Sequence, residues 1–187
     1  MKTYAIELLD REIWKGTCIP VEYQSDEYYD ICVQKTENGF QIPIEKKQFE
    51  QTFVHDPSMQ EYPDRLYEDW WEQAEAFGII DDGKLLAAIE VCEEEWSKRI
   101  WITELFVSEV IRGQGWGRKL IEKAKEYTRE KNCRALLLET QSSNANAVDF
   151  YMHMGFTLIG FDSCAYTNED VERHEVRFNM GWFPGHD

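Results

Sequence analysis

The stretch Arg112-Gly113-Gln114-Gly115-Trp116-Gly117 could bind a phosphate group. It lies between an apolar run, residues 100–107, and an amphipathic run, residues 118–128. If the first run is a strand and the second a helix, the glycines form a turn whose backbone N–H groups can surround a diphosphate at the positive end of the helix dipole. Glycine suits this turn because a Cβ would obstruct both the turn and the ligand. Such turns are also common as plain connections, so the stretch alone indicates only a candidate site.

A second set of candidate residues follows the next apolar run, residues 135–139. Asn144 precedes Tyr151 by seven positions, and Gly155-Phe156 ends the segment. Asn144 can cap a helix or bond a ligand, and the phenol of Tyr151, with an ordinary pKa of ~10, can donate a proton. Two motifs in this order are more specific than either one alone.

The spacing of apolar residues predicts the elements that hold these motifs. Residues 100–107 alternate as a strand does, and residues 118–128 carry one apolar face that stops before Asn132. Residues 135–139, apolar up to Leu138, are typical of a strand covered on both faces, and residues 144–153 form a helix ended by a glycine. Further strands are expected at residues 76–80, 85–92, 156–161 and 175–182.

The first third of the chain carries a different pattern. Asn38-Gly39 lies between apolar alternations, which predicts a hairpin over residues 27–47. Pro43 would then lie on an edge strand, because proline cannot donate to a central ladder. Residues 1–20 fit a strand or a short helix, and the pattern leaves both open.

A turn-rich stretch, residues 55–63, follows this hairpin. Asp64 can cap a helix after it, because apolar residues recur at helical spacing through Trp70 and Ala74. We expect this helix to pack through Trp70.

Together the two motifs resemble those of the GNAT N-acetyltransferases, over about residues 76–156. The resemblance implies one α/β (α+β) domain over residues 1–187, with a mixed central sheet of about six to seven strands, splayed between the fourth and fifth and flanked by helices. It divides the chain into a variable acceptor-side region, an acetyl-CoA-binding core and C-terminal strands, at residues 1–75, 76–160 and 161–187.

The resemblance also implies acetyl-CoA as co-substrate and assigns its contacts. The backbone of Gly113 to Arg118, with Arg112 nearby, would hold the pyrophosphate. Main-chain groups near Phe106 and Val107 would pair with the pantetheine arm at a splayed strand edge. Asn144 would bond the same arm, and a plain N-cap role for it stays open.

Acetyl transfer to an amine needs a base, because an alkylammonium with a pKa of ~10 is almost wholly charged at neutral pH. The resemblance points to Glu104 as that base and to Tyr151 as the acid that protonates the departing thiolate. Two alternatives stay open: Glu104 as an acidic lining for a cationic substrate, and Tyr151 as a packed core aromatic.

A narrower resemblance, to the streptothricin acetyltransferases, rests on Leu138-Glu139-Thr140-Gln141, Asn144, Gly155-Phe156, Gly160-x-Asp162 and Tyr166. It implies acetylation of a primary amine on a cationic small molecule, the β-lysine amine of a streptothricin-type antibiotic. Carboxylates that could line such a pocket are Glu90, Glu104, Glu139 and Asp162. The alternatives are a protein N-terminal or lysine acetyltransferase and a non-catalytic acyl-CoA-binding module.

The composition agrees with a cationic acceptor. A formal net charge of −16 repels nucleic acid and attracts cations, although an acidic surface also serves solubility alone. No apolar run approaches the ~18–20 residues of a membrane helix and no apolar leader is present, so we expect no membrane partner and a cytoplasmic protein. Five cysteines and four histidines lack metal-ligand spacing, which predicts packed, reduced thiols and no metal. The sequence leaves a monomer and a homodimer open.

Overall fold

The structure, a computed structural model, describes residues 2–55 and 63–185. These residues form two compact units. Unit 1 contains the described residues up to Val21, residues 63–138 and those from Trp182 onward, and unit 2 contains residues 22–55 and 139–181.

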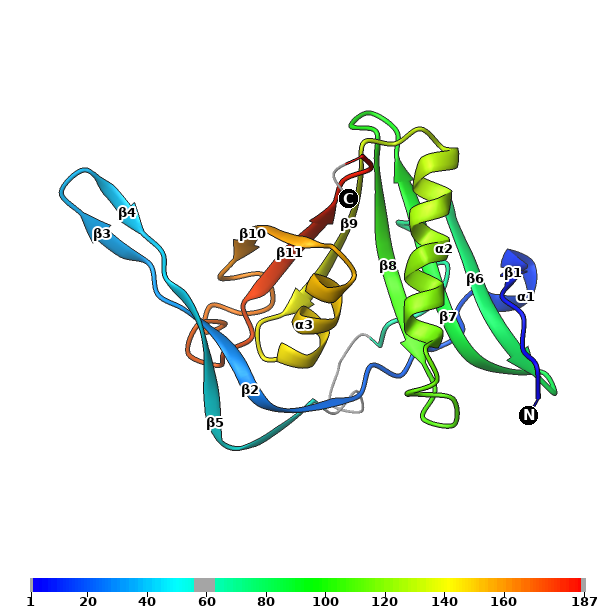
Figure 1. The fold of residues 1–187 in the computed structure, drawn as a ribbon, viewed down its shortest axis with the longest axis horizontal. Coiled ribbons are helices and arrows are strands. Elements are labelled where there is room, and N and C mark those ends of the chain that lie inside the picture. The colour runs from blue at the N-terminus through cyan, green and yellow to red at the C-terminus, as the bar shows by residue number, and fades with distance from the viewer. Residues whose placement is uncertain (1, 56–62, 186–187) are drawn as a thin grey trace. The chain divides into compact units, whose positions relative to one another are not determined.

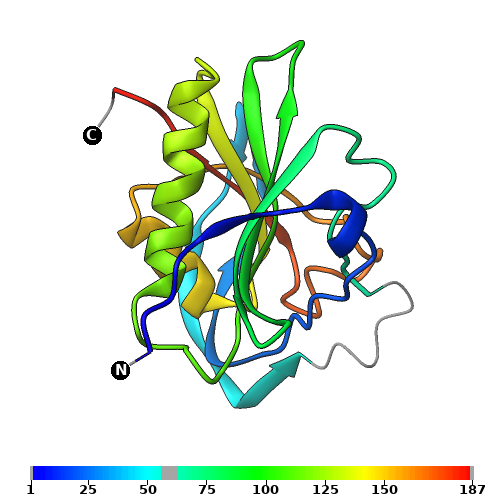
Figure 2. The same ribbon diagram turned by 90° about the vertical axis from the view of Figure 1, so that its right-hand side faces the viewer.

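Unit 1 is built on an antiparallel meander of three strands, β6 (Ala74–Asp81), β7 (Lys84–Glu94) and β8 (Arg99–Val107). The short strand β1 (Glu7–Leu9), drawn in dark blue, pairs antiparallel with β6, and α1 (Arg11–Trp14) follows it (Figures 1 and 2). The tight turn between β6 and β7 uses Asp82 and Gly83, which both have positive φ values, as its Asp-Gly sequence predicts.

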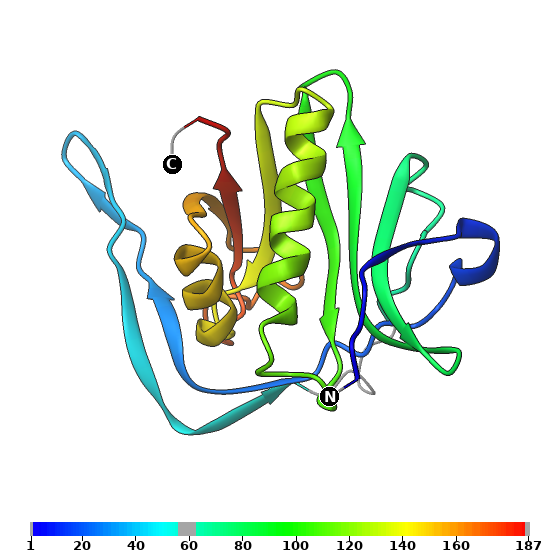
Figure 3. The same cartoon turned by 45° about the vertical axis from the view of Figure 1, so that its right-hand side comes forward.

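Helix α2 (Trp116–Glu130) lies along β7 and β8 in unit 1 (Figure 3). It buries Leu120, Ile121 and Ala124, the apolar face that its sequence spacing predicts. Asn132 takes a left-handed φ of 53° just past the helix end, which confirms the expected stop.

Unit 2 contains a long antiparallel pair, β2 (Tyr23–Ile31) with β5 (Ile44–His55), which continues into the hairpin β3 (Gln34–Thr36) and β4 (Gly39–Gln41) (Figure 1). The expected hairpin around Asn38-Gly39 is therefore confirmed, and it extends further than expected. The unit also holds helix α3 (Ala145–His153) and the antiparallel pair β10 (Thr157–Asp162) and β11 (Arg177–Trp182).

Seven strands are hydrogen-bonded in the order β1-β6-β7-β8-β9-β11-β10. The pairing of β8 with β9 (Ala135–Gln141) is parallel, and the β1–β6, β6–β7, β7–β8 and β10–β11 pairs are antiparallel. This confirms a mixed sheet of six to seven strands. Residues 135–138 of β9 are all buried, as the continuous apolar run predicts.

The fourth and fifth strands in this order, β8 and β9, are paired over a short length. Their register joins residues 99–101 to residues 135–137, at the start of both strands. Strand β8 continues to Val107 in register with β7. Its later residues therefore have their ladder partners on the β7 side, as a splayed sheet requires.

The helix expected from Asp64 does not form, and that prediction is wrong. Leu66 donates its amide to the carbonyl of Thr17 at 3.0 Å, and Tyr67 has a φ of 60°, which no α-helix accepts. Trp70 is 70% exposed, so the expected packing through it is also wrong. Residues distant in the sequence hydrogen-bond to the main chain of this segment. These bonds outweigh the helical spacing of its apolar residues.

Two smaller expectations also fail. Pro43 lies between β4 and β5 and belongs to neither strand, and its carbonyl accepts the amide of Cys32 at 3.2 Å. All five cysteines are free thiols, yet Cys18, Cys32 and Cys164 are exposed rather than packed. Most of the turn-rich stretch after the first hairpin, residues 56–62, lies outside the described residues.

Candidate active site

The glycine turn joins β8 to α2 and leaves backbone donors at the start of that helix. Gly113 and Gly115 have left-handed φ values of 76° and 83°, and Gly115 is the N-cap residue of α2. Its carbonyl accepts the amide of Lys119 at 3.2 Å. The amides of the first turn have no acceptor within a helix, so residues 116–118 carry donors that an anion can use.

The structure changes the reason for glycine at these positions. Beyond the adjoining residues, an added Cβ at Gly113 or Gly115 would meet no described atom within 4 Å, so crowding by other parts of the chain is not what requires glycine there. The requirement is conformational, because other residues rarely adopt such φ values. Gln114 between them is exposed, and its side-chain amide donates to the carbonyl of Val110 at 3.3 Å.

Cationic side chains flank the turn. Arg112 is exposed, and its guanidinium donates to the carbonyl of Val107 at 3.4 Å, so this cation is held near the end of β8. Arg118 is exposed as well. Lys119 Nζ lies 3.7 Å from the centre of the half-buried Trp116 ring, which places a third cation beside the start of α2. This surface favours an anionic ligand in an otherwise acidic chain.

The two residues expected to meet the pantetheine arm lie at the end of β8. Phe106 and Val107 are half-buried and stand opposite Ala88 and Ala87 of β7. The register of β8 with β9 ends at Trp101, well before them. Because a strand bonds alternately to its two sides, one edge of this part of β8 can bond an extended ligand.

Glu104, the expected base, is half-buried on β8 and stands directly opposite Glu90 of β7. Directly opposed residues on an antiparallel pair project from the same face of the sheet. A register shift beside this pair leaves Thr103 without an opposite residue, which marks an irregularity of the strand next to Glu104.

Glu90 is fully buried and belongs to the core, so it does not line an open pocket as we expected. One of its carboxyl oxygens accepts the amide of Tyr67 at 2.6 Å, and the other accepts the hydroxyl of Thr103 at 2.8 Å. Burial raises the pKa of Glu90, and the bonds from Thr103 and Tyr67 offset part of that rise. Glu90 therefore connects the irregular part of β8 to the segment around Tyr67.

In unit 2, Asn144 and Tyr151 lie on α3. Asn144 is its N-cap residue, and its side-chain oxygen accepts the amide of Ala147 at 3.1 Å. The capping role left open by the sequence is therefore present. Tyr151 is half-buried, with its ring centre 5.4 Å from that of Phe150 and 5.9 Å from that of Phe156.

Two further carboxylates of unit 2 share one cation. Arg177 on β11 lies 3.3 Å from Glu139 and 3.4 Å from Asp162, measured between guanidinium nitrogens and carboxylate oxygens. Sequence reasoning proposed both carboxylates as pocket lining and missed Arg177. Its position in an alternating strand near the end of the chain contains no signal for this contact.

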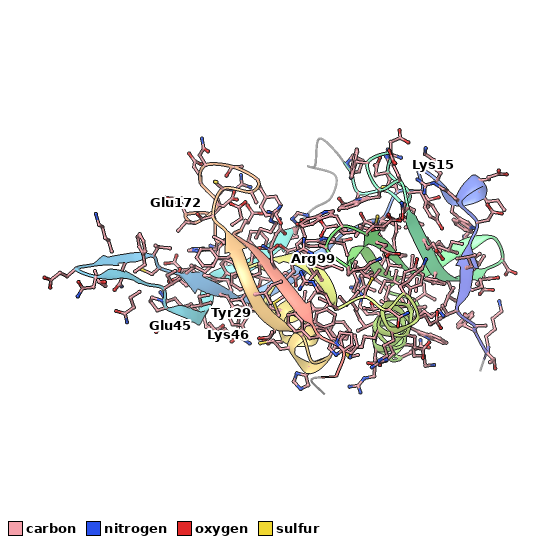
Figure 4. The ribbon with its side chains drawn as sticks, turned by 90° about the horizontal axis from the view of Figure 1, so that it is seen from above. Lys15, Tyr29, Glu45, Lys46, Arg99 and Glu172 are labelled. Atoms are coloured by element: carbon pink, nitrogen blue, oxygen red, sulfur yellow. The ribbon has the colours of Figure 1, made fainter. Side chains whose placement is uncertain are left out.

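A second polar cluster ties α3 to the β2–β5 pair within unit 2. The hydroxyl of Tyr29 donates to Asp149 at 2.7 Å, and the Lys46 ammonium also bonds Asp149. The Lys46 ammonium lies 5.2 Å from the Tyr29 ring centre, and Figure 4 labels both residues. Partial burial would raise the pKa of Asp149, but the bonds from Lys46 and Tyr29 lower it. This cluster holds α3, and with it Asn144 and Tyr151, against the hairpin.

The structure thus groups the expected site residues by unit. The glycine turn, Glu104, Phe106 and Val107 belong to unit 1, and Asn144 and Tyr151 belong to unit 2. Among the described residues, no cluster of three or more His, Cys, Asp or Glu side chains is arranged to hold a metal ion. No helix within the same residues is long and apolar enough to span a membrane.

Comparison with known proteins identifies the family of the chain. Residues 43–156 match the model of the acetyltransferase (GNAT) family, which is more than half of the chain. A streptothricin acetyltransferase of Escherichia coli is 32% identical over 114 residues, which span 61% of this chain and 65% of that protein. The match therefore covers less than two thirds of that relative's length.

Two solved structures resemble the chain along nearly its whole length. A crystal structure of nourseothricin acetyltransferase has a TM-score of 0.72 and 25% identity, covering 97% of this chain and 99% of that one. A putative streptothricin acetyltransferase from Bacillus anthracis, in complex with acetyl coenzyme A, has a TM-score of 0.70 and 19% identity, covering 97% of each chain. The second likeness concerns the fold alone.

Proposed function

The chain belongs to the acetyltransferase (GNAT) family, and from that premise we propose that it transfers the acetyl group of acetyl-CoA to a primary amine of a cationic small molecule. The observation that carries the proposal is the turn that opens α2. Its two left-handed glycines and first-turn amides form an anion site directly after β8, the strand that carries Glu104.

The residues of the turn fit the pyrophosphate of acetyl-CoA. The amides of Gly113 and of residues 115–118 would supply directed hydrogen bonds, whereas the amide of Gln114 already donates to the carbonyl of Ile111 at 3.4 Å. Arg112 and Arg118 would supply positive charge without a metal. The edge of β8 at Phe106 and Val107 would bond the pantetheine arm. Asn144 would add its side-chain amide N–H groups, which remain donors while the side-chain oxygen caps α3.

We assign the role of base to Glu104. The amine must lose its proton before its nitrogen attacks the thioester carbon, and a carboxylate on the strand that ends in the cofactor turn can accept that proton directly or through water. Support comes from its partial burial and from its position between the glycine turn and the irregularity at Thr103.

We assign the role of acid to Tyr151. When the C–S bond breaks, the CoA thiolate takes a proton, and a phenol with an ordinary pKa of ~10 can supply it. The ring of Tyr151 is held between Phe150 and Phe156, which fixes its direction within unit 2. The phenol recovers its proton from water after the products leave.

For the acceptor, we propose a streptothricin-type antibiotic acetylated on its β-lysine amine. Support comes from the streptothricin and nourseothricin acetyltransferases among the similar proteins and from the net charge of −16, which attracts cations. We also propose a cytoplasmic location, because free thiols at all five cysteines are usual in a reducing compartment.

Thiol release from acetyl-CoA tests the proposal. The purified chain is assayed with streptothricin, spermidine, an aminoglycoside and short peptides with free N-termini or lysines, and we expect saturable turnover with streptothricin. Turnover with peptides alone would contradict the antibiotic acceptor and indicate a protein acceptor. Tight CoA binding without turnover on any amine would contradict the enzyme and indicate an acyl-CoA-binding module.

A further inference from the structure

A cavity of about 700 Å³ opens in unit 1 where the β7–β8 turn meets the segment before β6. Its volume lies in the range of small-molecule sites. None of the residues assigned above to acetyl transfer lines it. Four indoles and four carboxylates, with one lysine, make up most of the lining: Trp70, Trp71, Trp96, Trp101, Glu72, Glu93, Glu94, Glu95 and Lys98.

The indoles of this cavity are unusually open to solvent. Trp70 is 70% exposed and Trp96 is 83% exposed, although tryptophan contributes most to stability when it is buried. Neither ring serves the core of the described chain. Large exposed aromatic rings around a cavity with a polar rim indicate a binding surface.

A cation already lies against two of these rings. The guanidinium carbon of Arg99 is 5.6 Å from the ring centre of Trp96 and 5.9 Å from that of Trp101. The same guanidinium bonds Glu94 through its Nε at 2.7 Å. Two lining indoles and a lining carboxylate thus already contact one cation, Arg99, and the same kinds of group bind ammonium ligands.

The other carboxylates leave negative charge for a ligand. Glu93 lies 3.6 Å from Lys98 and 3.9 Å from Lys131, so it is largely balanced. Glu72 and Glu95 are exposed, and no ion pair joins either of them to another described residue.

The wall is also held in place. Arg11 donates to the backbone carbonyl of Glu72 at 2.8 Å and to that of Trp71 at 3.3 Å, which fixes this segment to α1. Such a preformed site loses little conformational entropy when it binds.

We infer that this cavity, the Trp/Glu pocket, binds an organic oligo-cation, a molecule with two or more ammonium or guanidinium groups. One cationic group lies over the indoles of Trp70 and Trp96, and a second pairs with the carboxylates of Glu72 and Glu95. We assign two or more charges to the ligand because the lining offers two kinds of partner for a cation, exposed indoles and exposed carboxylates.

The pocket has a defined position relative to the assigned base. Trp101 lines it and lies on β8 three residues before Glu104, a distance of about 10 Å along an extended strand. The oligo-cation can therefore have two sources: the far end of an acceptor whose amine reaches Glu104, or a separate polyamine effector.

The binding test uses the whole chain without acetyl-CoA, so it does not depend on acetyl transfer. Isothermal titration with spermidine is compared among wild type, Trp70→Ala/Trp96→Ala and Glu72→Gln/Glu95→Gln. We expect the tryptophan pair to weaken binding roughly fivefold to thirtyfold, since each cation–π contact contributes about 0.5–1 kcal/mol. The glutamine pair is expected to weaken it several-fold and to reduce its dependence on salt.

Matched controls separate this site from general effects of charge and surface. Phe40→Ala removes an exposed aromatic ring of unit 2, and Glu126→Gln/Glu130→Gln removes two exposed carboxylates of α2. Spermidine affinity equal to wild type is expected in both. An undiminished affinity in the tryptophan pair, or an equal loss in the controls, would overturn the inference, as would butylamine binding as tightly as spermidine.

A kinetic arm distinguishes the two sources of the oligo-cation. If it is the acceptor's far end, Trp70→Ala/Trp96→Ala raises the acceptor KM and leaves kcat near its wild-type value. If it is an effector, the variant keeps the acceptor KM and loses the change in rate that added spermidine causes in wild type. If the chain transfers no acetyl group, the titration still decides whether the Trp/Glu pocket binds an oligo-cation.

Discussion

The two ends of strand β8 carry groups of opposite character. After Val107, the strand leads into the glycine turn, where backbone amides, Arg112 and Arg118 favour an anion. Around Trp101, at the other end, indole rings and carboxylates form the Trp/Glu pocket, which favours a cation. Glu104 lies three residues from Trp101 and three from Val107.

This contrast is what one strand would need in order to hold two unlike substrates. A strand rises about 3.3 Å per residue and is stiffened by its ladder, so it fixes the distance between an anion site and a cation site. The anion site depends on main-chain groups, which any sequence with suitable φ values can supply. The cation site depends on particular side chains, so it can vary while the anion site is retained.

The largest expected effect is at the midpoint between the two ends. Glu104→Gln removes the proposed base and keeps the shape, so kcat should fall about 10²–10⁴-fold with little change in melting temperature. Steady-state kinetics and thermal unfolding measure the two quantities, and Glu126→Gln on α2 is the charge-matched control. A higher acceptor KM with an unchanged kcat would instead make Glu104 a lining carboxylate.

Tyr151→Phe tests whether the chemistry needs a group outside β8. The change removes one hydroxyl and keeps the ring contacts with Phe150 and Phe156. We therefore expect kcat to fall roughly 10²-fold and the melting temperature to remain unchanged. Tyr28→Phe, at a half-buried tyrosine of the same unit whose ring contacts Phe49 and His174, is the control. Equal turnover in Tyr151→Phe and wild type would rule out the acid role.

Gly115→Ala tests the anion end. At a φ of 83° an alanine costs about 1–2 kcal/mol, which lowers the melting temperature by roughly 2–8 °C, and its methyl group should weaken CoA binding about tenfold. Gly83→Ala, at a φ of 75° in the β6–β7 turn, creates the same strain far along the sequence. Titration with CoA should give a weaker affinity for Gly115→Ala than for Gly83→Ala. An equal CoA affinity in both variants would contradict the proposal that CoA binds at Gly115.

Asn144 tests whether unit 2 contributes to cofactor binding. Asn144→Ala should lower the free energy of unfolding by about 1 kcal/mol, because it removes the N-cap of α3. Asn144→Asp keeps the cap and loses the amide donors, so the KM for acetyl-CoA should rise about twofold to tenfold at an unchanged melting temperature. An unchanged KM in Asn144→Asp would leave Asn144 as a cap alone.

The smallest effect concerns the buried partner of Glu104. Burial raises the pKa of Glu90 above its ordinary value of 4.5, so the folded state holds its proton more tightly than the unfolded state. Glu90 therefore favours folding most at pH values below 4.5, and this contribution is lost as the pH rises through the folded-state pKa.

In Glu90→Gln this pH-dependent loss should be absent, since an amide can still accept from Tyr67 and bond Thr103. Urea unfolding of both proteins between pH 4.5 and 7 measures the difference, which should grow with pH in favour of the variant. A difference that stays constant over this range would show that Glu90 does not change its charge there.

Local patterns predicted most of unit 1. The alternation of residues 100–107, the apolar face of α2 and the stop at Asn132 are local signals, and all three were confirmed. They succeed because the period of burial follows directly from strand or helix geometry. The helix expected at Asp64 failed because Tyr67 and its neighbours are bound by residues distant in sequence, which a local pattern does not contain.

The candidate site divides in the same way. The chain's own residues determined the glycine turn, since its left-handed φ values strongly favour glycine wherever the turn occurs. Only the tertiary structure decided that Glu90 is core, that Arg177 holds Glu139 and Asp162, and that exposed indoles surround a cavity. Burial, ion pairing and cavities depend on which distant residues meet, and residue spacing along one chain does not specify that.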